Sequence, residues 1–346
     1  MKSFEQLSHR VQINKLRKLA QEVAKRYPVE PESISLLQYE DNAVFKLTET
    51  GGESYILRIS APDGYSEVEQ MSEITWLNAL NRETDVIVPQ PVATSDGQPL
   101  VIVSDSRWGV KPRVCVLFRW IPGSLPNKKL TPTLVEQMGQ VTAKLHNHAE
   151  SFAPAGKFVR PDWGWERLFG ADSVFASDKA GRHLTSDETD IFAQAGDRIR
   201  DALKNQGKDR SRYGLIHSDL HRGNVLVHEG SVRVIDFDDC GWSYYLLDVA
   251  TMLSSLYRML QNDLPKYSTL KEAYLKGYTS VRALPPDWDE SLGVFLVMRD
   301  MVIVNFILSS ENEQVMSWGI DRVKGIIPQV GAFLKHGRYV GHEIYA

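Results

Sequence analysis

The sequence predicts an α+β fold with two lobes: a small N-terminal lobe with an antiparallel β-sheet and a larger, mostly helical C-terminal lobe. Apolar and β-branched residues alternate or cluster in short segments up to residue 120, as strands require. After the break at Pro122-Gly123, apolar residues recur mainly at helical spacing. The chain has 346 residues, which is long enough for two lobes. We therefore divide it into residues 1–120 and 121–346.

The N-terminal lobe is predicted to begin with an amphipathic helix and to continue with three strands. Pro28 and Pro31 end the helical pattern, and Gly51-Gly52 is a hairpin turn between the second and third strands. A second helix then precedes extended segments, of which the last is almost wholly apolar. The predicted elements are a helix near 4–27, strands at 33–39, 43–48 and 54–59, a helix at 66–80 and a buried strand at 114–120.

The C-terminal lobe is predicted to begin with a helix that starts at Thr131-Pro132. Thr131 is the N-cap, and Pro132 occupies the first helical position, where a missing N–H costs nothing. Two short hairpins follow, and beyond them the sequence is largely helical. The helical segments with the clearest pattern lie at 246–260 and 292–308.

A carboxylate pair and an amide fall in the two tight loops of residues 216–239, which have the pattern strand, loop, strand, turn, strand. His217, Asp219 and Asn224 have the spacing H-x-D-L-x-x-x-N, and Asp236 ends the next strand. A carboxylate such as Asp219 can orient a hydroxyl and accept its proton, while amide and carboxylate oxygens are the hard ligands that Mg²⁺ prefers. A hairpin with ordinary polar turn residues is the alternative. The coincidence of these four residues at this spacing favours phosphoryl transfer.

On these residues the chain resembles the aminoglycoside phosphotransferase and choline kinase superfamily. Within it, the chain is similar to the branch that holds type II homoserine kinases and the bacterial stress-response kinase A. The specific resemblance covers residues 215–253, and a looser one begins near residue 38. It implies a bilobal protein-kinase-like fold, in which the N-terminal lobe binds the nucleotide and the C-terminal lobe carries the catalytic and acceptor-binding residues.

The resemblance also implies a role for each residue of the two loops. By resemblance, Asp219 is the catalytic base, and His217 is a structural residue that braces the loop. Asn224 and Asp236 are the implied metal ligands.

A kinase of this plan places a cation on the third strand to bind the nucleotide phosphates, and a helix carboxylate to hold that cation. The candidates are Arg58 and Glu73. Protein kinases have a lysine at this position of the strand. An arginine can also bind phosphate, because its guanidinium donates several N–H groups to the phosphate oxygens. Glu69 competes with Glu73, and Lys46 competes with Arg58. A cation or carboxylate that faces solvent is the alternative for each.

The adenine ring is expected against the backbone of the strand between the lobes, at Phe118, Trp120 and Ile121. The sequence lacks a G-x-G-x-x-G loop, which protein kinases use to cover the phosphates and which small-molecule kinases often lack. ATP and Mg²⁺ are therefore the expected cofactors, with GTP left open.

Four residues of the C-terminal lobe are candidates for acceptor binding: Asp238, Asp239, Arg299 and Asp300. Asp238 and Asp239 are either ligands of a second metal or of the acceptor hydroxyl, or solvated turn carboxylates. Arg299 and Asp300 lie inside an apolar helix, where charges are costly unless paired or functional. They form a structural ion pair or face the carboxylate and amine of an acceptor.

Other polar and aromatic residues of this lobe have mainly structural interpretations. Asp248 is interpreted as a helix N-terminal carboxylate that braces the catalytic loop. His146 and His148 are interpreted as ordinary helix residues. Trp163 and Trp165 form a packed pair at a helix start or a wall for a cationic acceptor.

Composition and charge disfavour several functional classes. The net charge of −4 gives no basic footprint for nucleic acid or for a membrane surface. Cys115 and Cys240 lack C-x-x-C partners, which disfavours a zinc site and a disulfide framework. In the apolar segment 292–308, Arg299 and Asp300 would each cost about 3 kcal/mol in a bilayer. With no apolar signal-peptide region at the start, we expect a soluble cytoplasmic protein.

The function we predict is an ATP- and Mg²⁺-dependent kinase that transfers the γ-phosphate to a hydroxyl of a small molecule. Amino alcohols, hydroxy-amino acids, sugars and aminoglycosides all remain open as acceptors. The alternative is a protein Ser/Thr kinase resembling stress-response kinase A, which would phosphorylate itself. A nucleotide-binding pseudokinase is disfavoured because Asp219, Asn224 and Asp236 are all present. The sequence leaves the oligomeric state open.

Overall fold

The computed structural model describes residues 4, 6–105, 107, 111–126, 130–337 and 339. The chain forms two compact units, of which the first comprises Met1–Pro122 and Ala153–Arg160. The second comprises Gly123–Phe152 and Pro161–Ala346. The lobe boundary that we place between residues 120 and 121 stays a prediction.

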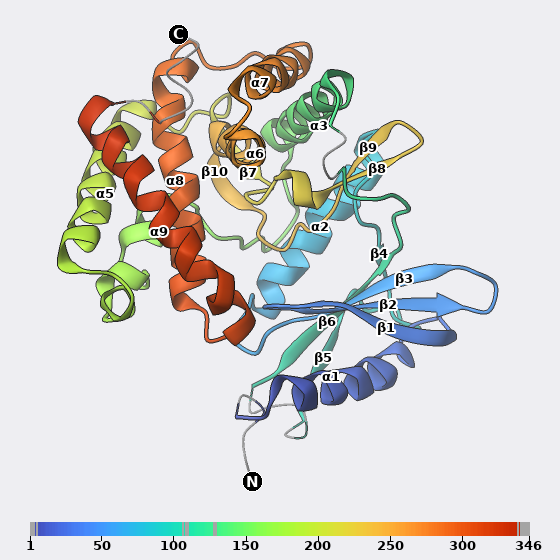
Figure 1. Ribbon diagram of the computed structural model, residues 1–346. Helices are drawn as coiled ribbons and strands as arrows, with labels where there is room; N and C mark the ends of the chain where they lie inside the picture. Colours follow the sequence, from blue (N-terminus) through green and yellow to red (C-terminus); the bar gives the residue numbers. More distant parts are fainter. Residues whose placement is uncertain are drawn as a thin grey trace. The chain divides into compact units, whose positions relative to one another are not determined.

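The first unit contains a six-stranded antiparallel sheet and two helices (Figure 1). The strand order is β1-β2-β3-β6-β4, with β5 paired to β6. The elements are α1 (His9–Ala24), β1 (Pro31–Tyr39), β2 (Ala43–Glu49), β3 (Ser54–Ile59), α2 (Glu67–Glu83), β4 (Pro91–Val92), β5 (Val101–Val103) and β6 (Arg113–Arg119).

The core of the first unit lies between α1 and the sheet. Alternate residues of β2 point into it, so that Phe45 and Leu47 are fully buried. They join Leu57 of β3 and Leu19 of α1 in one apolar cluster. Period-two alternation on a strand and a helical stripe therefore bury their apolar residues against each other.

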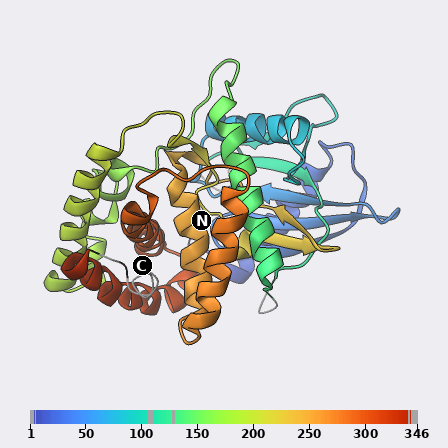
Figure 2. The ribbon, with the colours of Figure 1, turned by 90° about the horizontal axis from the view of Figure 1, so that it is seen from above.

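The second unit is mostly helical and carries two small antiparallel sheets, β7 with β10 and β8 with β9. Its helices are α3 (Pro132–Ser151), α4 (Trp165–Phe169), α5 (Ser186–Gln206), α6 (Tyr245–Leu260), α7 (Leu264–Thr279), α8 (Trp288–Ser309) and α9 (Glu313–His336). Its strands are β7 (Tyr213–Ile216), β8 (Val225–His228), β9 (Ser231–Val234) and β10 (Gly241–Tyr244). Helices α3 and α7 run side by side (Figures 1 and 2).

Helix α8 is long and apolar enough to cross a membrane by length and composition alone. In the structure, 78% of its most apolar window is buried. Both charged residues of its middle are buried as well, Arg299 at 8% and Asp300 at 1% exposure. The segment is therefore a core helix of the second unit, as its two charges predict.

The predicted α+β class is confirmed, and most predicted elements differ from the observed ones only at their ends. The leading helix is shorter than predicted: it begins at His9, because Ser8 has an extended backbone, and it ends at Ala24. The last strand of the first sheet is displaced by one residue, to Arg113–Arg119. Strand β10 was not predicted, since its four residues are recognisable only by their pairing with β7.

Candidate active site

The turn after β7 carries the predicted catalytic loop, and one buried carboxylate holds its backbone. The N–H groups of His217 and Ser218 donate to the two carboxylate oxygens of Asp248, each at 2.8 Å. Asp248 lies in the first turn of α6 and is fully buried. Ser218 has a φ of 72°, a left-handed conformation that costs free energy in a residue with a side chain. The two hydrogen bonds offset this strain and fix the direction in which Asp219 leaves the turn.

His217 links the two loops of the motif. Its Nε2 lies 3.0 Å from the carbonyl oxygen of Ile235, and its ring packs 4.5 Å from that of Phe237. The side chain is fully buried. These contacts are those of a structural brace, although the role assigned to His217 stays a prediction.

Asn224 is oriented by the carboxylate that precedes it. Its amide Nδ2 donates to the Asp219 backbone oxygen at 3.0 Å and to the Asp219 Oδ2 at 2.9 Å. Because the nitrogen faces Asp219, the amide oxygen is directed elsewhere and can bind a cation. A metal ligand needs this orientation.

Asp236 lies next to Asn224 by the register of the β8–β9 hairpin. Val225 pairs with Val234, and the N–H of Ile235 then donates to the backbone oxygen of Asn224 at 3.0 Å. Asp236 follows directly, with a φ of 69°, and the residue is exposed. A turn with positive φ redirects its side chain out of the strand.

The donor set fits a hard divalent cation. Within the described ranges, no group of three His, Cys, Asp or Glu residues could hold a metal alone. The predicted ligands, an amide oxygen and a carboxylate, would therefore leave several positions for phosphate oxygens and water. Mg²⁺ in nucleotide sites is commonly bound in this way.

Asp219 sits in a strongly cationic setting. Arg299 donates from Nη2 to Asp219 Oδ1 at 2.5 Å, and His221 Nε2 lies 3.4 Å from Oδ2. Burial by itself would raise the pKa of this carboxyl, but the charges of Arg299 and His221 outweigh it and hold the pKa well below its usual range. The carboxylate therefore stays ionised and has a fixed orientation.

The four candidates for acceptor binding have different contacts in the structure. Arg299 and Asp300 do not form the expected ion pair with each other, because successive helix residues point in different directions: Arg299 contacts Asp219, and Asp300 accepts a 2.5 Å hydrogen bond from Tyr339. Asp238 and Asp239 are partly buried. The backbone oxygen of Asp239 accepts from the indole N–H of Trp163 at 2.8 Å, which favours the packing interpretation for this tryptophan.

Behind Asp248 lies a network that the sequence interpretation missed. His146 of α3 is fully buried, with Nε2 3.2 Å from Asp248 and Nδ1 2.9 Å from the hydroxyl of Tyr278 on α7. Burial lowers the pKa of His146, although its hydrogen bond with Asp248 acts in the opposite direction. His146 is thus a structural helix residue, but the sequence carries no local signal for its partner 102 positions away.

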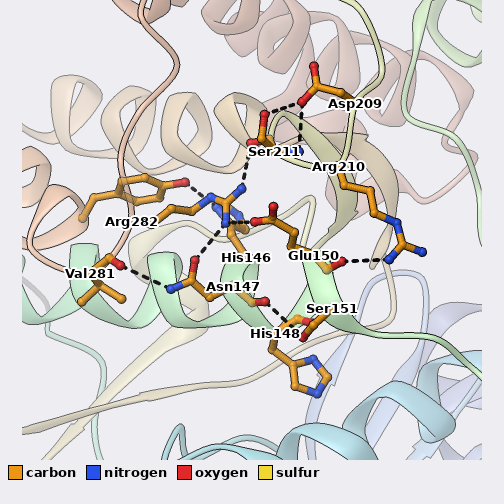
Figure 3. A network of polar contacts seen from close by, with 11 residues as sticks. His146, Asn147, His148, Glu150, Ser151, Asp209, Arg210, Ser211, Val281 and Arg282 are labelled. Atoms are coloured by element: carbon orange, nitrogen blue, oxygen red, sulfur yellow. Dashed lines mark hydrogen bonds and ion pairs between the residues drawn. The ribbon is translucent and has the colours of Figure 1, made fainter.

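The same face of α3 is tied to neighbouring segments by further polar contacts (Figure 3). Arg282 donates to the side chains of Asn147 and Glu150 and to the backbone oxygen of Ser211. Its guanidinium also lies 4.5 Å from the centre of the Tyr245 ring. These contacts anchor α3 behind the catalytic turn.

The predicted nucleotide residues of the first unit include a buried ion pair. Arg58 of β3 donates to both carboxylate oxygens of Glu73 on α2, at 2.8 and 2.5 Å. Its guanidinium also lies 5.3 Å from the ring centre of Phe118. Glu69, the rival of Glu73, instead caps the helix with Ser66.

An open hollow borders the end of β6. It is lined by Lys46, Gly52, Glu53, Ser54, Arg119, Trp120 and Pro122. Lys46 does not replace Arg58 on the Glu73 carboxylate, since its ammonium lies over the Trp120 ring at 4.2 Å. Trp120 therefore borders an accessible surface, and the adenine contacts of Phe118, Trp120 and Ile121 stay predictions.

The chain is similar to known proteins in sequence and in structure. The chain is 26% identical to an amicoumacin kinase of Bacillus subtilis (strain 168) over 83% of each protein. It is 28% identical to a homoserine kinase of Neisseria meningitidis serogroup B, over 70% of this chain and 72% of that protein.

The structure of a microcompartment-associated aminopropanol kinase superposes with a TM-score of 0.78 and 29% identity, covering 92% of this chain and 97% of the other. The kinase-like fold that we predict is thereby confirmed. Residues 36–290 match the model of the phosphotransferase enzyme family. The chain belongs to the phosphotransferase enzyme family and is a kinase.

Proposed function

We propose that this kinase transfers the γ-phosphate of ATP, with Mg²⁺, to a hydroxyl group of a small molecule in the cytoplasm. The observation that carries the proposal is the arrangement of Asp219, Asn224 and Asp236. The Asn224 amide nitrogen binds Asp219, and the hairpin register brings Asp236 next to Asn224. In the proposal, Asp219 serves the acceptor hydroxyl, and the side-chain oxygens of Asn224 and Asp236 serve the cation.

In the proposed reaction, Asp219 orients the acceptor hydroxyl and takes its proton as the new O–P bond forms. The bond between the β-phosphate oxygen and the γ-phosphorus breaks, and ADP leaves. A bound divalent ion would neutralise the phosphate oxygens at Asn224 and Asp236. In the first unit, Arg58 is assigned to the nucleotide phosphates, with Glu73 fixing its orientation.

Small-molecule acceptors are supported by the relatives. Their names describe kinases of amicoumacin, homoserine and aminopropanol, which all carry hydroxyl and amino groups. A coupled assay of ADP release with a panel of amino alcohols, hydroxy-amino acids, sugars and aminoglycosides tests the proposal. At least one compound should stimulate ADP release above the background ATPase rate. If labelled ATP marks the protein itself and no compound competes, the acceptor is a protein.

Replacement of Asp219 by Asn tests its role directly. We expect kcat to fall by about 10²–10⁴, because the hydroxyl loses its proton acceptor, while the affinity for ATP is retained. The matched control is Asp178→Asn, an exposed carboxylate of the same unit that pairs with Arg182 and has no place in the proposed reaction. Near-normal turnover of the Asp219→Asn enzyme would remove this residue from the mechanism.

A further inference from the structure

His221 is a residue of the catalytic turn to which the proposed reaction gives no role. Its Nδ1 atom accepts a hydrogen bond from the backbone N–H of Gly223 at 2.9 Å. A backbone N–H can only donate, so Nδ1 is the acceptor and the proton of the ring is on Nε2. The turn therefore selects one tautomer of His221, in which Nε2 is a hydrogen-bond donor.

Gly223 also fixes the position of this ring. A Cβ atom added at Gly223 would lie 2.4 Å from Cε1 and 2.8 Å from Nδ1 of His221. The imidazole thus occupies the space that a side chain at position 223 would need, and it is both packed against the turn and hydrogen-bonded to it. A side chain held in two ways presents its free nitrogen in a defined direction.

The free nitrogen of His221 lies next to Asp219. Nε2 is 3.4 Å from Asp219 Oδ2, and the two side chains are 30% and 25% exposed. This distance is longer than the about 2.7–3.2 Å of ordinary N–H···O hydrogen bonds. Oδ2 already accepts from Asn224 at 2.9 Å, and Oδ1 accepts from Arg299 at 2.5 Å. Asp219 is thus held by two other donors, and the Nε2–H of His221 remains accessible to a ligand.

The proposed reaction brings phosphoryl oxygens to this place. An acceptor hydroxyl that Asp219 orients must have its oxygen within about 2.8 Å of a carboxylate oxygen. The γ-phosphorus must then lie next to the hydroxyl oxygen, because the two atoms form the new bond. A donor beside Asp219 Oδ2 is therefore also beside the phosphoryl group, whose oxygens carry the charge of the transition state.

We propose that His221 is a further catalytic residue, whose Nε2–H binds an oxygen of the phosphoryl group as it passes from ATP to the acceptor. The proposal rests on the proposed function and adds a residue to it. The acceptor oxygen bonds to the γ-phosphorus, the bond from this phosphorus to the β-phosphate oxygen breaks, and the hydroxyl proton goes to Asp219. His221 keeps its own proton throughout and supplies only a hydrogen bond.

Two substitutions separate the functions of the two ring nitrogens. The amide nitrogen of His221→Gln can occupy the place of Nε2, whereas the shorter side chain of His221→Asn reaches only the place of Nδ1 and can still accept from Gly223. In the coupled ADP assay, His221→Asn should lower kcat by about 10²–10³, as the loss of one transition-state donor does. His221→Gln should keep most of the wild-type kcat. If His221→Asn is instead the active variant and His221→Gln the inactive one, the hydrogen bond within the turn is what matters, and the proposal is overturned.

Binding of MgADP with aluminium fluoride, which imitates the phosphoryl group in transfer, gives a second measurement that needs no turnover. His221→Asn should weaken this binding by about tenfold or more, the range of a charge-assisted hydrogen bond, and should leave the affinity for MgADP alone unchanged. The same loss is expected when His221→Asn is added to Asp219→Asn. If the loss disappears there, His221 acts through Asp219 and the proposed contact is wrong. An equal loss of affinity for MgADP alone would also overturn the proposal.

His228→Asn is the matched control, because His228 is a partly exposed histidine of the same unit whose Nε2 lies 3.9 Å from a carboxylate oxygen of Glu229. Its kcat and its binding of both ligands should equal those of the wild type. If aluminium fluoride binding depends on His221 while no hydroxyl compound stimulates ADP release, the phosphoryl contact stands and the small-molecule acceptor fails. If the wild type does not bind MgADP with aluminium fluoride, the proposed function fails and the role of His221 fails with it.

Discussion

At Asp219, both carboxylate oxygens are engaged before any substrate arrives. Arg299 holds Oδ1 and Asn224 holds Oδ2. Such a carboxylate is a weak base with a fixed orientation. It suits a reaction in which positioning and charge stabilisation dominate and the proton moves late, as in phosphoryl transfer through a loose transition state.

Glu73 is expected to stabilise the first unit strongly, because its partner Arg58 is buried with it, at 7% and 1% side-chain exposure. Glu73→Gln should lower the free energy of unfolding by about 3–5 kcal/mol, since it leaves a buried guanidinium without its counter-charge. Urea denaturation measures this. Glu83→Gln is the control on the same helix, because the pair of Glu83 with Arg82 is exposed and such pairs contribute at most about 1 kcal/mol. If both substitutions lower the free energy of unfolding equally, the buried pair of Glu73 with Arg58 does not stabilise the first unit as expected.

Asp300 should make stability depend on pH. Burial raises its pKa to about 6 from an ordinary 3.8, against the opposing effects of Tyr339 and the neighbouring arginines. A raised folded-state pKa means that the native state binds the proton more tightly. This contribution is complete below about pH 4 and is lost as the pH rises through about 6. The unfolding free energy of the wild type minus that of Asp300→Asn should therefore fall by up to about 3 kcal/mol from pH 4 to 7. If the difference in unfolding free energy between the two proteins is constant from pH 4 to 7, the pKa of Asp300 is not raised.

Among the elements, α3 and α7 are packed at unusually short range. A Cβ atom on Gly139 would lie 2.0 Å from the backbone oxygen of Tyr274, and one on Gly277 would lie 1.9 Å from that of Glu136. Neither backbone can yield without moving its helix. The glycines therefore set the distance between α7 and the helix that carries His146.

Gly277→Ala should force these helices apart and lower the free energy of unfolding by about 3 kcal/mol, the upper range for overpacking. Thermal or urea denaturation tests it. Gly325→Ala is the matched control in the interior of α9, where an added Cβ meets nothing within 4 Å. Alanine is the better helix former there, so this change should stabilise by up to about 1 kcal/mol. The two glycine-to-alanine substitutions should thus change the free energy of unfolding in opposite directions.

The elements that the sequence predicts well are those whose pattern is local. Strand β3 matches its predicted bounds at Ser54–Ile59, because a Gly-Gly turn and alternating apolar residues define it. Helix α2 begins at Glu67, one residue after its predicted start at 66, and the capping box of Ser66 with Glu69 stabilises that start. Strand β10 could not be predicted, since its identity depends on a partner strand that ends 25 residues earlier, at Ile216.

In the candidate site too, the sequence predicts residues that lie close together in the chain but not contacts between distant segments. The spacing of His217, Asp219 and Asn224 is visible in the sequence because one loop carries all three. The contact of Asp219 with Arg299 spans 80 positions, and that of Asp248 with His146 spans 102. The cost of burying its charge indicates that Arg299 must be paired or functional, but the sequence does not identify its partner.

The whole molecule divides the proposed nucleotide contacts between its two units, with Arg58 in the first and Asn224 and Asp236 in the second. A nonhydrolysable ATP analogue should therefore protect the assigned residues of each unit, and those of the second unit only with metal. At about 100 times its Kd, AMP-PNP with Mg²⁺ should add about 2.7 kcal/mol to the free energy of unfolding. Hydrogen exchange should slow in β3 and in the loop around Asn224 alike.

Removal of the metal tests the link between the two sets of contacts. With EDTA in place of Mg²⁺, the gain in stability from AMP-PNP should shrink, because the phosphates lose the cation that joins them to Asn224 and Asp236. Asp236→Asn with Mg²⁺ should resemble the wild type with EDTA, while its stability without nucleotide should stay near that of the wild type, since residue 236 is exposed. An equal gain with and without metal, or protection confined to β3, would show that the two loops of the second unit do not bind the nucleotide through a metal ion.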